Sequence, residues 1–193
     1  MRRALILAAL VLMSLAPAHS FAAWGLGANL GMTLHDPAES GADNVTLIGF
    51  PSQASVFTSL RPGLRVAYAG DSSPHEAYLD VSLDHEASNG DNFTAVRLGG
   101  NYQYNFNGSS FRPYVTAGLG VFSEHANFSG STSATSMTFG GGAGIGFPVG
   151  NQAGRLRLEA RFDKLQEGKD NGEVVIGEAT IMSLLFGFDL WLR

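Results

Sequence analysis

The last thirteen residues constrain the fold of this chain more than any other stretch. From Ile181 to Arg193, every second residue between Met182 and Leu192 is apolar, and most of the positions between them are small, polar or charged. Successive side chains leave a strand on opposite faces, so strict alternation predicts a β-strand. The pattern is longer than an ordinary strand of about 5–6 residues and reaches the roughly 9–11 residues that a tilted strand needs to cross a bilayer. It is typical of a membrane-spanning strand.

The same alternation recurs in seven further segments, at residues 24–34, 58–69, 76–85, 93–106, 111–123, 137–149 and 155–163. The connections between segments alternate between short turns, such as Asn107-Gly108, and long polar stretches. The long stretches cover residues 35–55, 86–92, 124–135 and 164–178. The sequence therefore predicts an all-β fold, an eight-stranded antiparallel up-and-down transmembrane β-barrel with extracellular loops, periplasmic turns and both termini in the periplasm.

The N-terminus predicts export from the cytoplasm. A short basic region, Met1-Arg2-Arg3, precedes an apolar run from Ala4 to Ala16 and a small-residue region that offers cleavage near Ala22 or Ala23. The run is shorter than the roughly 20 apolar residues of a helical anchor. We expect a cleaved signal peptide over residues 1–22 and one barrel domain over residues 23–193.

Composition narrows the functional classes. The chain has 12 Lys and Arg against 17 Asp and Glu. Cleavage would remove Arg2 and Arg3 and no acidic residue, leaving a net charge of −7, which argues against nucleic acid as a partner. The chain has no cysteine and therefore no thiolate metal site. We expect no cofactor and no metal.

Alternation alone does not say which face points outward, because a soluble barrel carries its apolar residues inside. Here every arginine of the mature chain falls on the small, polar face or at its rim, and the only lysines are Lys164 and Lys169 in the last polar stretch. This polar face has the size of an eight-strand interior that side chains just fill. The apolar face is therefore expected to contact lipid.

Aromatic residues gather at the strand ends assigned to the periplasmic side. The expected interfacial girdle consists of Trp24, Tyr68, Tyr104, Phe106, Phe111 and Phe147. Trp191 has the opposite parity and is expected at the rim or in the lumen.

The polar face also carries acidic residues, and charges in a dry lumen must be paired. The predicted lumen charge network consists of Arg65, Asp80, Asp84, Arg97, Arg112, Arg157, Glu159, Arg161 and Asp189. Asp163 shares this face. We expect Glu159 to bridge arginines that include Arg112 or Arg97, and the ion pairs to plug the lumen.

Three segments of the sequence resemble a known protein family. Phe111–Val121, the glycine row of Phe139–Phe147, and Leu156–Phe162 resemble strands of the small OmpA-like/opacity-type outer-membrane β-barrel family, eight-stranded and porin-like. The resemblance implies a location in the cell outer membrane of a Gram-negative envelope and recognition by the barrel-insertion machinery. Members of the family usually end on an aromatic residue, whereas this chain ends Trp191-Leu192-Arg193.

We interpret the chain as a non-enzymatic, monomeric outer-membrane barrel with a structural or surface-interaction role through its extracellular loops. Its expected partners are membrane lipid and the insertion machinery, and the sequence names no extracellular ligand. One alternative is a small-solute channel, which requires a continuous lumen. Another is a lipid-modifying hydrolase at the outer rim, which requires Ser88 within reach of His85 or His125. His35 and His125 also fall at outer strand ends, where they could share a metal.

Overall fold

The computed structural model describes residues 22–37, 45–49, 63–70, 73–88, 91–108, 110–127, 131–150 and 153–192. The described residues form β-strands, turns and short connections. The strands are β1 (Ala22–Pro37), β2 (Val45–Gly49), β3 (Gly63–Gly70), β4 (His75–Ser88), β5 (Asp91–Asn105), β6 (Arg112–Asn127), β7 (Ser131–Val149), β8 (Gly154–Leu165), β9 (Gly168–Asp170), β10 (Glu173–Ile176) and β11 (Ala179–Leu192). No helix in these ranges is long and apolar enough to cross a membrane. The expected signal peptide lies outside them, apart from Ala22.

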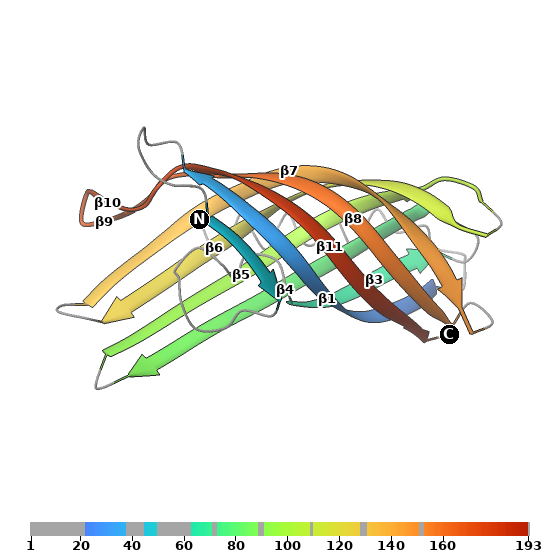
Figure 1. Ribbon diagram of the computed structural model, residues 1–193, viewed down its shortest axis with the longest axis horizontal. Coiled ribbons are helices and arrows are strands. Elements are labelled where there is room, and N and C mark those ends of the chain that lie inside the picture. The colour runs from blue at the N-terminus through green and yellow to red at the C-terminus, as the bar shows by residue number, and fades with distance from the viewer. Residues whose placement is uncertain are drawn as a thin grey trace.

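Eight strands close into one antiparallel barrel, in the order β1, β3, β4, β5, β6, β7, β8 and β11 (Figure 1). Each strand pairs with the next, and β11 returns to pair with β1 from Trp24↔Leu192 to Pro37↔Ala179. This closure pairs the backbone groups of both edge strands, which is the condition for a sheet to cross lipid. The predicted eight-stranded antiparallel barrel is confirmed.

The barrel has two unlike ends. At the right of Figure 1 lie the connections β3–β4, β5–β6 and β7–β8 and the end of β11. We call this the short-turn end. At the left lie the paired ends of β4 and β5, the paired ends of β6 and β7, and the small β9–β10 sheet, and we call this the long-loop end. The β9–β10 turn contains Asn171 and Gly172, both with positive φ, as a two-residue hairpin turn requires.

At the long-loop end the strands run further than the sequence predicts. Strand β6 continues through Asn127 and β7 begins at Ser131, so most of the stretch at 124–135 is paired sheet. Within the stretch at 86–92, the described residues belong to β4 and β5, which pair up to Ser88↔Asp91. On β6 and β7 the outward residues here, Ser123, His125, Ser133 and Thr135, are polar, so apolar alternation stops while the backbone pairing continues.

Two other expected loops also contain strands. The stretch at 35–55 includes β2, which pairs with the outer part of β1 from Gly31↔Gly49 to His35↔Val45. The stretch at 164–178 includes β9 and β10. The strand expected at residues 58–69 begins at Gly63 in the structure, and residues 58–62 lie outside the described ranges.

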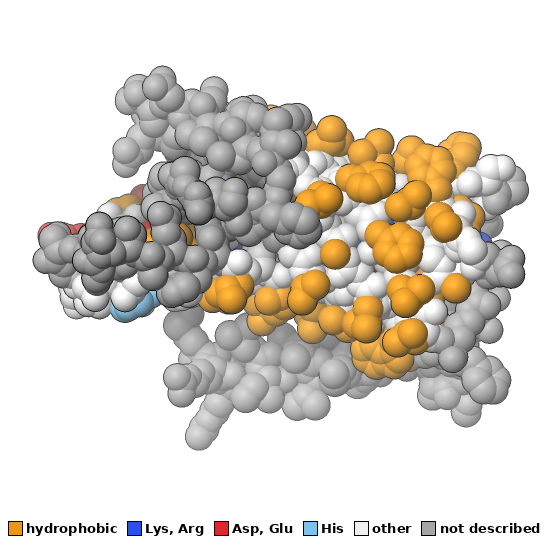
Figure 2. Space-filling view, turned by 60° about the horizontal axis from the view of Figure 1, so that its bottom comes forward, with side chains coloured by type: hydrophobic (Ala, Val, Ile, Leu, Met, Phe, Trp, Pro, Cys, Tyr) orange, Lys and Arg blue, Asp and Glu red, His pale blue; other side chains and the backbone are white. Residues whose placement is uncertain are grey.

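The apolar parity points outward. On β11, Phe186 is 52% exposed and its neighbour Leu185 is 3% exposed. Figure 2 shows hydrophobic side chains covering the barrel toward the short-turn end, while acidic side chains and a histidine are visible at the opposite end. A continuous apolar exterior of this kind is suited to lipid and not to water. These exposed fractions agree with the prediction that the apolar face points outward.

Candidate functional site

The inward faces of the strands carry a chain of ion pairs, which begins near the short-turn end around Asp189. The register pairs Asp189 with Arg155, and Gly187 with Arg157, so both arginines project inward beside the carboxylate. Arg155 donates to Asp189 at 2.7 and 3.1 Å, and Arg157 donates at 2.8 and 3.0 Å. Arg65 of β3 lies 3.8 Å from the same carboxylate.

Glu76 is the second carboxylate at this end. It accepts two hydrogen bonds from Arg155, at 2.7 and 2.8 Å, and forms an ion pair with Arg65. The guanidinium of Arg65 also lies over the ring of Tyr78, 3.5 Å from its centroid. Glu76 and Asp189 thus share Arg65 and Arg155 across the lumen, which joins β3, β4, β8 and β11.

Glu159 lies deeper in the lumen. Its carboxylate accepts a hydrogen bond from the hydroxyl of Tyr114 at 3.0 Å. It forms ion pairs with Arg157 at 3.9 Å and with Arg161 at 3.7 Å. Arg161 in turn donates to Asp163 at 3.0 Å. Glu159 therefore links the pairs at the short-turn end to those toward the middle of the barrel.

The chain of contacts continues to β4 and β5. Arg161 donates to Asn101 at 2.7 Å, Asn101 donates to Asp80 at 2.6 Å, and Arg97 donates to Asp80 at 2.7 Å. We call the ionised members of this chain the lumen network. They are Arg65, Glu76, Asp80, Arg97, Arg155, Arg157, Glu159, Arg161, Asp163 and Asp189.

The lumen network is charge-balanced, with five guanidinium and five carboxylate groups. Most of its side chains are 1–4% exposed. Desolvating an ion costs several kcal/mol, and only close pairing with further hydrogen bonds offsets that cost. Every carboxylate here has a guanidinium within 4 Å. The arrangement can fill a dry lumen without leaving an unpaired charge in it.

Glycines on β7 leave room for these side chains. A Cβ at Gly144 would lie 2.5 Å from the ring of Tyr114, and one at Gly142 would lie 3.1 Å from the side chain of Arg161. Both would also approach the backbone of β8 to 2.5 Å. The glycine row of the sequence is therefore the space that Tyr114 and Arg161 need.

Seven of the nine residues proposed from sequence lie in the lumen network: Arg65, Asp80, Arg97, Arg157, Glu159, Arg161 and Asp189. Arg112 does not, because it stands near the end of β6 and is exposed at the short-turn end. The side chain of Asp84 lies outside the described residues. The expected bridge from Glu159 to Arg97 or Arg112 is corrected, since the ion-pair partners of Glu159 in the described part of the chain are Arg157 and Arg161.

Glu76 is absent from the predicted network, although it is the first residue of the alternating segment at 76–85. It stands two residues before Tyr78 and four before Asp80, so the same parity points it inward. Its shared parity with Tyr78 and Asp80 is the sequence signal for its inward position.

The outer part of the lumen is apolar, which the sequence analysis did not anticipate. Buried residues from β5, β6, β7, β8, β10 and β11 form one cluster, here called the outer apolar layer. It consists of Phe93, Ala95, Phe122, Ala126, Ala134, Leu165, Ile176, Ala179 and Ile181. Ile176 comes from the β9–β10 hairpin, so the hairpin contributes to closing this end.

Glu124 is buried beside this layer, 8% exposed, with Ala95 and Ala134 as cross-strand neighbours. The outward residues flanking it, Ser123 and His125, are polar, so it lies beyond the apolar belt. It has no ion pair among the described residues. Burial raises the pKa of the Glu124 carboxyl to about 7, because the charged form loses its hydration.

The aromatic residues proposed as a girdle lie toward the short-turn end on the outward face. Trp24 and Tyr68 meet edge to face at 5.2 Å, and Tyr104 and Phe106 meet at 5.1 Å. Phe111 and Phe147 are exposed. Their role as an interfacial belt stays a prediction. Trp191 is partly buried, with Arg155 5.0 Å from its ring.

The structure describes only some of the residues proposed for the hydrolase and for the metal site. His125 is exposed on the outer part of β6, across from Thr94 and Ser133. The side chains of His35, His85 and Ser88 lie outside the described residues. Among the side chains that are described, no group of His, Asp and Glu has the geometry of a metal site.

A closed antiparallel barrel with an apolar exterior and a filled, charge-paired interior defines a membrane β-barrel protein. The chain belongs to the outer membrane protein beta-barrel domain family, whose sequence model matches residues 4–186. The resemblance proposed from three strand segments is thereby confirmed.

Solved structures agree at the level of the fold. Neisserial surface protein A is 14% identical with a TM-score of 0.57, over 87% of this chain and 97% of that one. The N-terminal barrel domain of Pseudomonas aeruginosa OprF is 14% identical with a TM-score of 0.50, over 87% and 97%. Ail of Yersinia pestis, solved with the heparin analogue sucrose octasulfate, is 10% identical with a TM-score of 0.50, over 89% and 99%. No curated protein matches the chain significantly.

Proposed function

We propose that this protein is a closed, non-conducting barrel of the Gram-negative outer membrane that serves as a rigid scaffold for a surface at its long-loop end. The observation that supports this proposal is the occupation of the lumen. The lumen network occupies the lumen above its short-turn mouth, and beyond it the outer apolar layer packs along β5 to β8 and β11. Water would have to displace both paired charges and an apolar cluster to form a continuous column.

The long-loop end is the part available for interaction outside the cell. There the strands extend past the apolar belt, and their outward face becomes polar at Ser123, Thr135, His125 and Ser133. Strand pairing holds this face in a fixed shape, so its residues are ordered in advance of any contact. The short-turn end, with the C-terminal end of β11, then faces the periplasm. The partners in this proposal are lipid around the belt and the insertion machinery during assembly, and the unit is a monomer.

No catalytic step is part of the proposal. The scaffold acts through binding at its outer surface and through the stability of its core, and neither requires a nucleophile or a metal.

An epitope-tag experiment tests both the orientation of the barrel and the exposure of its long-loop end outside the cell. A tag inserted at Asn171-Gly172, the tip of the β9–β10 hairpin, should be labelled by antibody on intact cells. The matched control is the same tag in the turn at residues 150–153, which should be labelled only after the outer membrane is permeabilised. Labelling of the control tag alone on intact cells would invert the proposed orientation, and recovery of the protein in the soluble periplasmic fraction would refute the scaffold.

A further inference from the structure

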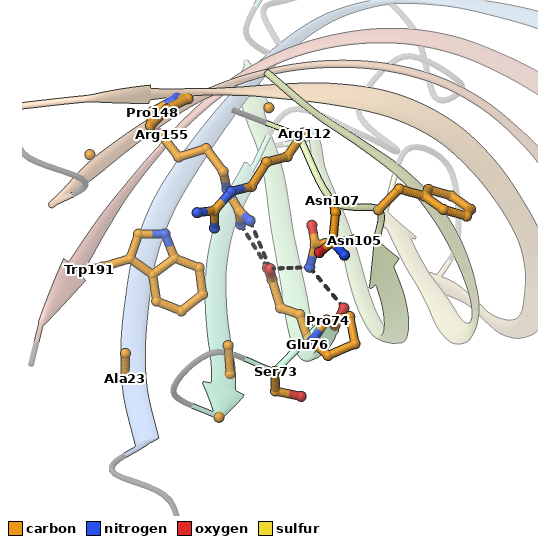
Figure 3. A pocket seen from close by; sticks show the side chains of 16 residues that line it. Ala23, Ser73, Pro74, Glu76, Asn105, Asn107, Arg112, Pro148, Arg155 and Trp191 are labelled. Carbon is orange, nitrogen blue, oxygen red and sulfur yellow. Dashed lines mark hydrogen bonds and ion pairs between the residues drawn. The ribbon is translucent and has the colours of Figure 1, made fainter. Parts of the chain in front are cut away.

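A cavity of about 700 Å³ opens at the short-turn end of the lumen, directly below the lumen network (Figure 3). Its wall includes Arg112, Arg155, Trp191, Asn105 and Asn107, contributed by β5, β6, β8, β11 and the β5–β6 connection. The close-up shows the side chains of Arg112 and Arg155 both reaching into this opening. Nothing in the scaffold proposal uses this cavity.

Arg112 differs from the other inward arginines. Each of Arg65, Arg97, Arg155, Arg157 and Arg161 has a carboxylate within 4 Å. Arg112 is exposed, and it has no carboxylate partner within the part of the chain that the structure describes. Its cross-strand neighbour on β7 is Gly146, which offers no side chain to contact it. The guanidinium therefore keeps its donors free at the mouth of the cavity.

Among the residues that the structure describes, cationic charge exceeds anionic charge at this end. Two carboxylates, Glu76 and Asp189, are here shared by Arg65, Arg155 and Arg157. Glu159, the next carboxylate inward, is shared between Arg157 and Arg161. Adding Arg112 places an unneutralised positive charge in a concave site with low-dielectric walls, which concentrates the field of that charge.

The chemistry of the walls specifies the ligand class. A guanidinium presents a planar fork of N–H donors that matches the oxygens of a carboxylate or phosphate. Trp191 supplies a flat apolar surface that packs against Arg155, and Pro74 extends the apolar wall. We propose that the cavity binds a small anion with a carboxylate or phosphate group, held by Arg112 at the mouth and seated against Trp191. The ligand would enter from the short-turn side.

The test uses the fluorescence of Trp191. The chain has two tryptophans, so Trp24→Phe leaves Trp191 as the only one in the mature protein. The refolded mature protein with this substitution is titrated in zwitterionic micelles with inorganic phosphate and, separately, with N-acetylglycine, at constant ionic strength. We expect a saturable change in Trp191 emission with at least one probe, and the tighter probe identifies the preferred anionic group.

Matched variants separate binding from a general salt effect. Arg112→Gln should weaken the binding at least tenfold, because it removes the free charge and leaves the ion pairs of the lumen network intact. Lys169→Gln, which removes a positive charge from the exposed hairpin at the other end, should leave the affinity unchanged. A heat-dependent shift in gel mobility confirms that each variant is folded. An unsaturable response to both probes, or equal affinity in folded Arg112→Gln, would overturn the proposal.

Discussion

Replacing Asp189 by Asn perturbs the most heavily shared carboxylate of the barrel. The side chain keeps its size, but it loses its charge and turns one acceptor oxygen into an N–H donor that faces guanidinium donors. Arg65 and Arg155 retain Glu76 as a partner. Arg157 loses its close carboxylate and keeps Asn29 at 2.7 Å and Glu159 at 3.9 Å. The substitution therefore leaves mainly one buried guanidinium, that of Arg157, without a close carboxylate.

The expected loss follows from this geometry. Breaking a buried ion pair by removing one partner costs about 3–5 kcal/mol, because the remaining charge stays buried. The free-energy losses of the four hydrogen bonds to Asp189 do not add, since Glu76 still neutralises two of the three arginines. We expect Asp189→Asn to lower the free energy of unfolding by about 3–5 kcal/mol. The control is Lys164→Gln, which breaks an exposed pair with Glu178 and should cost about 0–1 kcal/mol.

Equilibrium urea titration of the protein refolded into phospholipid vesicles measures both changes. A second variant, Arg157→Gln, completes a double-mutant cycle. Because the double variant leaves neither charge without its partner, its loss should be smaller than the sum of the two single losses. A loss below about 1 kcal/mol for Asp189→Asn, or strictly additive losses in the cycle, would refute the pairing argument.

Three further substitutions test other parts of the barrel. Leu119→Arg, on the outward face near mid-strand, should cost about 2–4 kcal/mol in the same vesicle titration, whereas Val174→Arg in the exposed hairpin should be nearly neutral. Gly144→Val should prevent the heat-dependent gel shift of refolded protein, because its Cβ would meet the ring of Tyr114 at 2.5 Å. Burial raises the pKa of Glu124 from 4.5 to about 7, so the native state favours the protonated form and stability should fall as pH rises from about 4.5 to about 7. Urea titrations across that range should show the fall in the wild type and lose it in Glu124→Gln.

The barrel could be predicted from sequence because its two faces differ in chemistry. Alternation along β11 predicts the strand, and the arginines of β8 mark the interior and so assign the apolar face to lipid. Where the outward face becomes polar, as at Ser123 and Thr135, both parities look alike and the pattern predicts a loop. The backbone hydrogen bonds between strands do not depend on the polarity of the side chains, so β6 and β7 stay paired to Asn127↔Ser131.

The pairing of individual charges could not be predicted, because parity says which side chains point inward and not which meet across the lumen. Glu159 is flanked by Arg157 and Arg161 on its own strand and pairs with both, and not with the expected Arg112 or Arg97 across the lumen. Asp189 and Arg155 meet through the register of β8 and β11, which depends on strand stagger. The outer apolar layer is not predicted for a related reason, since Phe93 and Phe122 share the inward parity of polar residues such as Arg97 and Glu124.

The central claim is that the lumen is closed. Single-channel recording of refolded wild-type protein in a planar lipid bilayer, in concentrated KCl, tests it most directly. The account predicts a bilayer whose current stays at the baseline after insertion, with incorporation verified by recovery of the folded protein from the membrane. Reproducible unitary current steps from the wild type would contradict the closed lumen and favour a small-solute channel.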